Sequence, residues 1–187
     1  MILPRFRRNP NRTSIAALYG AIVAQARLPA FYAAFAVPDT ALGRFDMVVL
    51  HTALLLRRLR AAQGPAQGLG QGLFDEFCRD MDANLREMGV SDVGVPREMR
   101  KLGEAFYGRA RAYDAALDAD GDEALAGALA RNLYAGAVRP PVAAAALTAY
   151  VRAAASALAA QDDAALARGE ARFPDPDPAT TIARAAE

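Results

Sequence analysis

Apolar residues recur along this chain at the three- and four-residue spacing of α-helices, and no stretch alternates with the two-residue period of strands. The pattern predicts helices over residues 13–27, 40–62, 73–88, 97–119, 122–134 and 141–168, with one short turn of helix over 30–35. The chain is therefore expected to be all-α.

The predicted helices differ in how much of their surface is apolar. The segment 40–62 is apolar on nearly all sides, which is typical of a helix buried among its neighbours. The segment 73–88 has a single apolar stripe with a charged flank, and Gly89 follows it as a C-terminal capping glycine. The glycine-rich stretch 64–72 is expected to be a flexible loop.

The length of 187 residues and the hydrophobic content of 53% suit one domain with a substantial core. We expect a single compact bundle of about six helices over residues 13–168. Residues 1–12 form a flexible basic arm in this interpretation, and residues 169–187 form a disordered tail. The Pro-Asp repeats within 174–181 are the reason for expecting that the tail does not pack.

Charge and composition exclude several classes of protein. The 22 Lys and Arg residues against 21 Asp and Glu residues leave a net charge of +1, which gives no general attraction for DNA. The single cysteine, Cys78, cannot form an internal disulfide, and there is no Cys/His cluster for zinc. The N-terminus does not resemble a secretory signal, and the alanine-rich stretch 141–160 is too weakly apolar for a convincing membrane span. A cytoplasmic location is expected.

The first twelve residues carry a local positive charge despite the neutral total. Four arginines lie there with Leu3 and Phe6 and with no acidic residue: Arg5, Arg7, Arg8 and Arg12. Such an arm suits an anionic membrane surface or ribosomal RNA. The alternative interpretation is a soluble tail without a partner.

His51 is the only histidine, and its surroundings do not favour catalysis. No Glu-x-x-His motif is present, so His51 cannot be half of a di-metal site in a helical bundle. On a helix it would lie along the same edge as Arg44 and Arg58, and both cations would depress its pKa. We interpret His51 as a hydrogen-bonded packing residue and expect no metal or cofactor.

Charged residues on the other helices are expected to pair between helices. Asp80 and Asp82 stand two residues apart, so they point to different sides of a helix and cannot share a proton or a metal. Arg109 lies at the edge of an apolar stripe and requires a carboxylate, for which Asp82 or Asp80 is the predicted partner. The alternative is that both aspartates are surface acids in helix-stabilising pairs.

Four ordered stretches carry a resemblance to a known family. They are LYGAIVAQAR (18–27), PAFYAAFAVPDTALGRFDMVVLH (29–51), LFDEFCRDMDANLREMGVSDVGVP (73–96) and AFYGRARAYDAAL (105–117). With them the chain resembles the ubiquinol–cytochrome c chaperones, which are assembly factors of the cytochrome bc1 complex. Since no mitochondrial presequence is evident, the chain is similar to the alphaproteobacterial members.

The resemblance implies a function in binding rather than in catalysis. It implies that the client is newly made cytochrome b, that a small partner chaperone can take part, and that the protein works at the inner membrane surface. It also suggests client-facing or structural residues along the apolar and polar face of the bundle: Asp39, Thr40, Arg44, Asp46, His51, Asp80, Asp82, Arg86, Tyr107, Arg109 and Tyr113.

Two other functions remain open from the residues alone. An unrecognised hydrolase would use Asp46, His51 and Asp80 or Asp82, although no motif supports it. A helical protein that binds a lipid or a quinone would enclose it with Met47, Met81 and neighbouring methionines, which at helical spacing more often form a core.

Overall fold

The computed structural model describes residues 11–134 and 141–177, and this part of the chain is helical with no strand. The elements are α1 (Arg12–Ala26), α2 (Pro29–Ala33), α3 (Ala41–Arg60), the 3₁₀ turn η1 (Gly64–Ala66), α4 (Leu69–Glu87), α5 (Val95–Asp118), α6 (Glu123–Leu133), α7 (Pro141–Ala159) and α8 (Asp163–Ala167). The predicted all-α class is confirmed.

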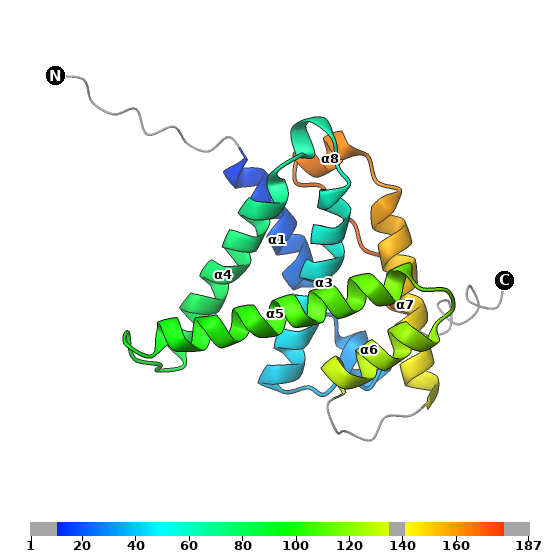
Figure 1. Ribbon diagram of the computed structural model, residues 1–187, viewed down its shortest axis with the longest axis horizontal. Helices are drawn as coiled ribbons and strands as arrows, with labels where there is room; N and C mark the ends of the chain where they lie inside the picture. The colour runs from blue at the N-terminus through cyan, green and yellow to red at the C-terminus, as the bar shows by residue number, and fades with distance from the viewer. Residues whose placement is uncertain (1–10, 135–140, 178–187) are drawn as a thin grey trace.

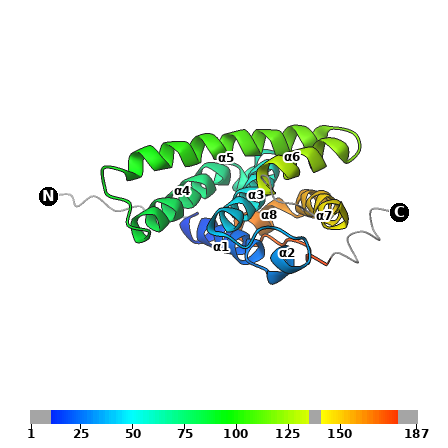
Figure 2. The same ribbon diagram turned by 90° about the horizontal axis from the view of Figure 1, so that it is seen from below.

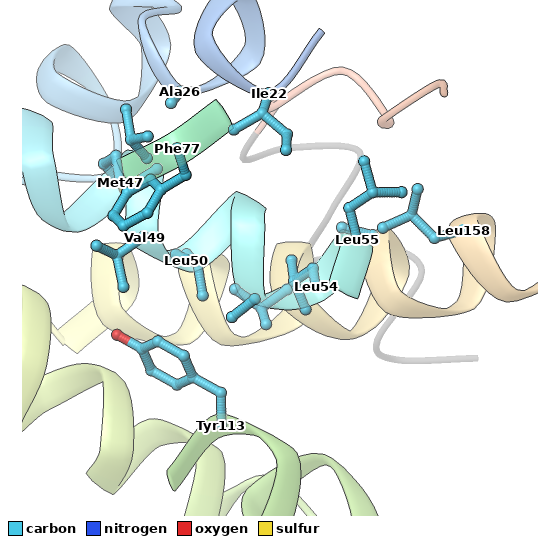
Figure 3. Packing of buried hydrophobic residues seen from close by; sticks show 14 of the residues in the cluster. Ile22, Ala26, Met47, Val49, Leu50, Leu54, Leu55, Phe77, Tyr113 and Leu158 are labelled. Carbon is cyan, nitrogen blue, oxygen red and sulfur yellow. The ribbon is translucent and has the colours of Figure 1, made fainter. Parts of the chain in front are cut away.

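Helix α3 is the centre of the bundle, as its two-sided apolar pattern predicted. Figures 1 and 2 show α1, α4, α5, α6 and α7 arranged around it, and each of these helices contacts it. The middle of α3 is almost inaccessible to solvent over Met47, Val49, Leu50 and Leu55. Figure 3 shows these side chains extending to opposite sides of the helix, toward Phe77 on one side and Leu158 on another.

Helices α4 and α5 form a hairpin that extends away from the rest of the bundle (Figure 1). Figure 2 shows α5 as an outer layer that crosses over α4 and α3. The predicted capping glycine is confirmed, since Gly89 has a φ of 84° and follows the last turn of α4. A glycine adopts this left-handed conformation without steric cost and so ends the helix.

The prediction of a flexible loop over 64–72 is wrong. Residues Gly64–Ala66 form a 3₁₀ turn, and α4 begins at Leu69 rather than at residue 73. Leu69 is buried because it continues the stripe of Leu73 and Phe77 by one more turn. A Cβ atom at Gly72 would lie 2.3 Å from Cδ1 of Ile15, so this glycine allows α1 to approach α4 closely.

The predicted last helix, 141–168, is two helices in the structure. Helix α7 ends at Ala159, and Asp162 caps α8 by accepting a hydrogen bond from the N–H of Ala165 at 3.2 Å. Arg58 of α3 satisfies the end of α7, because its guanidinium donates to the carbonyl oxygens of Leu158 at 3.0 Å and Gln161 at 2.7 Å. Carbonyl groups at a helix end need such partners.

The expected disordered tail from residue 169 is wrong for residues 169–177. Phe173 packs against the core, Pro176 is buried, and the main chain is bonded to Gln25 and Gln161. Prolines prevent helix formation here but do not prevent packing. The expected disorder of residues 178–187 and the expected flexibility of residues 1–10 concern residues outside the described ranges.

Two segments are long and apolar enough to cross a membrane by length and composition, Arg12–Ala33 and Val142–Ala159. Core helices of globular proteins pass the same test. Leu147, Val151 and Leu158 of the second segment are fully buried within the bundle, which is the packing of a core helix.

Candidate functional site

The loop before α3 presents a polar, exposed surface. Thr40 is the N-cap of α3, and its side chain accepts a hydrogen bond from the N–H of Gly43 at 3.1 Å. Arg44 donates to Asp39 at 2.6 Å, and both side chains are more than half exposed. The hydrogen bond from Arg44 lowers the pKa of Asp39. The guanidinium of Arg44 also lies 5.9 Å from the centre of the Tyr32 ring, which is cation–π range.

Asp46 lies one turn further along α3 and is buried. Its side chain is 2% exposed, and its Oδ1 lies 2.9 Å from Nη2 of Arg109 on α5. Among the described residues no donor is aligned for a hydrogen bond to this oxygen, so charge attraction carries the contact. Burial raises the pKa of Asp46 to about 6, and the positive charge of Arg109 opposes that increase.

The predicted inter-helix ion pair of Arg109 is thus present, but the predicted partners Asp82 and Asp80 are wrong. Asp80 accepts a hydrogen bond from the hydroxyl of Tyr19 at 2.7 Å, and Asp82 accepts one from Arg86 at 2.7 Å. Arg109 reaches Asp46 because α5 crosses over α3. The sequence pattern gives the apolar face of each helix, but it does not give the crossing that selects one aspartate over another.

Tyr113 lies one turn beyond Arg109 on α5 and belongs to the same buried interface. Its side chain is 1% exposed, and Figure 3 shows the ring directed toward Val49 of α3. Burial, and then the charge of Asp46, raise the pKa of its hydroxyl. Asp46, Arg109 and Tyr113 therefore lie together in the interface between α3 and α5.

His51 is completely buried and forms part of a chain of hydrogen bonds through the core. Its Nδ1 lies 2.8 Å from the carbonyl oxygen of Met47, which can only accept, so Nδ1 carries the proton. In a neutral ring Nε2 then accepts from the hydroxyl of Tyr150 at 2.9 Å. That hydroxyl in turn accepts from Gln25 at 3.0 Å. The interpretation of His51 as a hydrogen-bonded packing residue agrees with this geometry.

The predicted cause of the His51 pKa shift needs correction. Burial lowers the pKa of His51 to about 4, and the hydrogen bond to Met47 opposes the decrease. Arg44 is bound to Asp39, and Arg58 is bound to Asp163 and to the end of α7. The two arginines are therefore not the source of the shift. The imidazole is neutral at pH 7 because it is removed from water.

One flank of α4 is charged and exposed. Arg86 contacts Asp82 one turn earlier on the helix and also Asp92 in the loop before α5. These pairs are largely in solvent, where an ion pair contributes little to stability. Asp82 and Arg86 are therefore available to a partner, whereas Asp80 is tied to α1 through Tyr19.

An apolar groove lies where α4 and α5 meet the second half of α3, and it was not predicted from the sequence. The groove has a volume of about 420 Å³. Its apolar lining comes from three helices: Ala53, Leu56, Leu59, Phe74, Phe106, Tyr107 and Ala110. Tyr107 stands at its edge with 62% of its surface exposed, and its ring lies 5.3 Å from that of Phe74. An exposed aromatic residue beside an apolar groove is typical of an interaction site.

Most of the basic arm lies outside the residues that the structure describes. Arg5, Arg7 and Arg8 fall outside the described residues, while Arg12 is exposed at the first position of α1. The possible role of this arm at a membrane or a ribosome stays a prediction.

The described residues do not bring together a reactive set. No group of three His, Cys, Asp or Glu side chains among them could hold a metal ion. Cys78 is half-buried against the core, and burial raises the pKa of its thiol, which disfavours the reactive thiolate. Asp46 and His51 belong to separate buried networks, so the hydrolase alternative has no geometric support.

Comparison with known proteins agrees with a binding function. The family model described as Ubiquinol-cytochrome C chaperone matches residues 33–173. Among solved structures, the crystal structure of the Cbp3 homolog from Brucella abortus is similar, with 44% sequence identity and a TM-score of 0.80. The match covers 89% of this chain and 91% of that one. A search of curated proteins gave no significant match.

The match includes α3, α4, α5 and the first part of the packed segment 169–177, so it contains the Asp46–Arg109 pair, the bonds of His51 to Met47 and Tyr150, and the groove described above. The chain belongs to the ubiquinol-cytochrome c chaperones, a family of assembly factors for the cytochrome bc1 complex and not of enzymes.

Proposed function

We propose that this chain binds newly made cytochrome b and stabilises it until the bc1 complex is assembled. Family membership supports the general role, and the apolar groove between α3, α4 and α5 supports the binding mode. Cytochrome b is an integral membrane protein, so before assembly it exposes apolar helix surfaces. A groove lined by Leu56, Phe74 and Tyr107 can cover part of such a surface.

The proposed client surface combines this groove with charged residues that lie farther along the same helices, outside the groove lining. Asp82 and Arg86 lie on α4, and Asp39 and Arg44 lie at the start of α3. Exposed charges at the rim of an interface set its specificity and association rate more than its affinity. We assign a structural role to the side chains that lie between the helices: Asp46, His51, Arg109 and Tyr113.

The proposed location is the inner surface of the cytoplasmic membrane, where a membrane-inserted client is accessible. The basic arm, with Arg5, Arg7, Arg8 and Arg12, would add an attraction for anionic lipids or for a translating ribosome. A small partner chaperone remains compatible with the exposed surfaces that the client leaves free.

The test compares two exposed apolar side chains on different parts of the bundle. A photo-crosslinking residue at Tyr107 should capture cytochrome b in cells, and Tyr107→Ser should weaken co-purification of cytochrome b. Val142, at the start of α7, is 67% exposed and lies outside the groove, so crosslinking there and Val142→Ser provide the matched control. Equal capture of cytochrome b from both positions, or none from Tyr107, would contradict the assignment of the groove.

A further inference from the structure

The segment after α8 is bound to the bundle in the manner of a peptide ligand. Residues 170–177, here named the C-terminal strap, leave α8 and run without regular secondary structure along the body between α3 and α7 (Figure 1). Figure 2 shows the same segment lying between α7 and the region of α1 and α2. The strap therefore lies between α7 and α1, two helices that both flank α3.

The body binds the main chain of the strap with two glutamine side chains. Gln161 accepts from the N–H of Arg172 at 2.9 Å and donates to the carbonyl oxygen of the same residue at 2.7 Å. Gln25 donates to the carbonyl oxygen of Pro174 at 2.8 Å. Hydrogen bonds of this kind recognise an extended backbone without regard to its side chains.

Side-chain selectivity is expected from the contact of Phe173 with the buried ring of His51, here named the aromatic seat. The ring of Phe173 lies 5.1 Å from that of His51 in an edge-to-face arrangement. The imidazole is fixed by its bonds to Met47 and Tyr150, so the seat is rigid. Pro176 is buried further along, and Pro174 and Pro176 hold the strap extended because each fixes its own φ angle.

The two glutamine residues that bind the strap are also hydrogen-bonded to other parts of the bundle. Gln161 also donates to the carbonyl oxygen of Ala157 at 3.1 Å, and its own carbonyl oxygen accepts from Arg58. Gln25 is bonded to Tyr150 as well as to Pro174. The surface that holds the strap, here named the strap site, is therefore expected to keep its shape when the strap leaves, which is the property of a preformed peptide-binding site.

We propose that the strap site is a peptide-binding site and that the C-terminal strap is its intramolecular ligand. An extended segment of a partner polypeptide with an aromatic residue followed by prolines, as in Phe173-Pro174-Asp175-Pro176, replaces the strap. The strap then acts as an autoinhibitory contact. This site lies on a different part of the bundle from the α3/α4/α5 groove and does not depend on the proposed client.

The test uses the full chain and a labelled synthetic peptide with the sequence of residues 170–177, EARFPDPD. In the wild-type chain the tethered strap competes at an effective concentration on the order of millimolar. Phe173→Ala in the chain weakens the tethered strap, so this variant should bind the peptide at least tenfold more tightly than the wild type. Arg172→Ala is the matched control, because only the main chain of Arg172 is bonded by Gln161, and it should bind like the wild type.

Fluorescence anisotropy measures the binding, and a peptide with alanine in place of its phenylalanine should not bind. A second measurement, on the wild-type chain, protects the test against misfolding of the variant. Millimolar peptide should accelerate amide hydrogen exchange within residues 170–177 severalfold and leave α5 unchanged. Equal affinity of the wild type and Phe173→Ala, or no change in exchange of the strap, would overturn the proposal.

Discussion

The buried pair of Asp46 and Arg109 allows a quantitative prediction. In Arg109→Met the carboxylate of Asp46, which is 2% exposed in the wild-type chain, loses the positive charge 2.9 Å away. Removal of one partner from a buried pair costs about 3–5 kcal/mol of unfolding free energy. The matched control is Arg86→Met, since Arg86 pairs with Asp82 at the surface with 47% of its side chain exposed. An exposed pair of this kind contributes at most about 1 kcal/mol.

The unfolding free energy is also expected to depend on pH through Asp46. Burial raises the pKa of Asp46 from 3.8 to about 6, so between these values the folded chain binds more protons than the unfolded chain. Stability contributed by this group is therefore present at low pH and is lost as the pH rises through 6. This rise of the Asp46 pKa from 3.8 to about 6 corresponds to about 3 kcal/mol of unfolding free energy. Loss of Arg109 raises this pKa further and moves the change toward neutral pH.

Urea unfolding of both variants between pH 4 and 8 measures these effects. Arg109→Met should be strongly destabilised at pH 8 and should recover much of its stability toward pH 4, whereas Arg86→Met should stay close to the wild type. The double variant Asp46→Leu with Arg109→Met should be more stable than Arg109→Met, because no buried charge remains. A loss below about 1 kcal/mol for Arg109→Met at pH 8, similar to that of Arg86→Met, would refute the reasoning.

Three other predictions follow from single residues and from the basic arm. Burial lowers the pKa of His51 to about 4, so the folded chain loses stability through this group as the pH falls from 6.5 to 4. His51→Gln should remove roughly 3 kcal/mol of that loss, measured by urea unfolding at both ends of the range. Gly43→Ala should destabilise the fold, because a Cβ there would lie 2.0 Å from the carbonyl oxygen of Pro38, whereas Gly103→Ala on α5 has open space and should stabilise by up to about 1 kcal/mol in thermal unfolding. Replacement of Arg5, Arg7, Arg8 and Arg12 should weaken sedimentation with anionic vesicles or ribosomes without a change in the circular dichroism spectrum, and a variant that still sediments fully would exclude the arm as the contact.

The sequence predicted the helices well where local signals were strong. The two-sided apolar pattern of α3 identified the central helix, and Gly89 marked a helix end through capping. The sequence failed where tertiary contacts decide. Glycines at 70 and 72 indicated a loop, yet the burial of Leu69 stabilises a helix there.

The same limit explains the errors in the candidate site. The position of Arg109 at the edge of an apolar stripe indicated an ion pair, but the partner depends on how α5 crosses α3. The Pro-Asp repeats after Phe173 indicated disorder from composition, yet Gln161 and the sequence-distant Gln25 bind this segment through its main chain. The α3/α4/α5 groove could not be predicted, because its lining residues come from three helices whose relative positions the pattern does not define.

The lifetime of newly made cytochrome b tests the central proposal most directly. In a pulse–chase experiment with and without the gene for this chain, the transcript of cytochrome b should be unchanged. Deletion of the gene for this chain should shorten the lifetime of labelled cytochrome b and lower the amount of assembled bc1 complex. Expression of the wild-type chain should restore both. His51→Gln should restore them as well, since His51 is assigned a packing role. A deletion strain in which cytochrome b has a normal lifetime and the bc1 complex assembles normally would contradict the account.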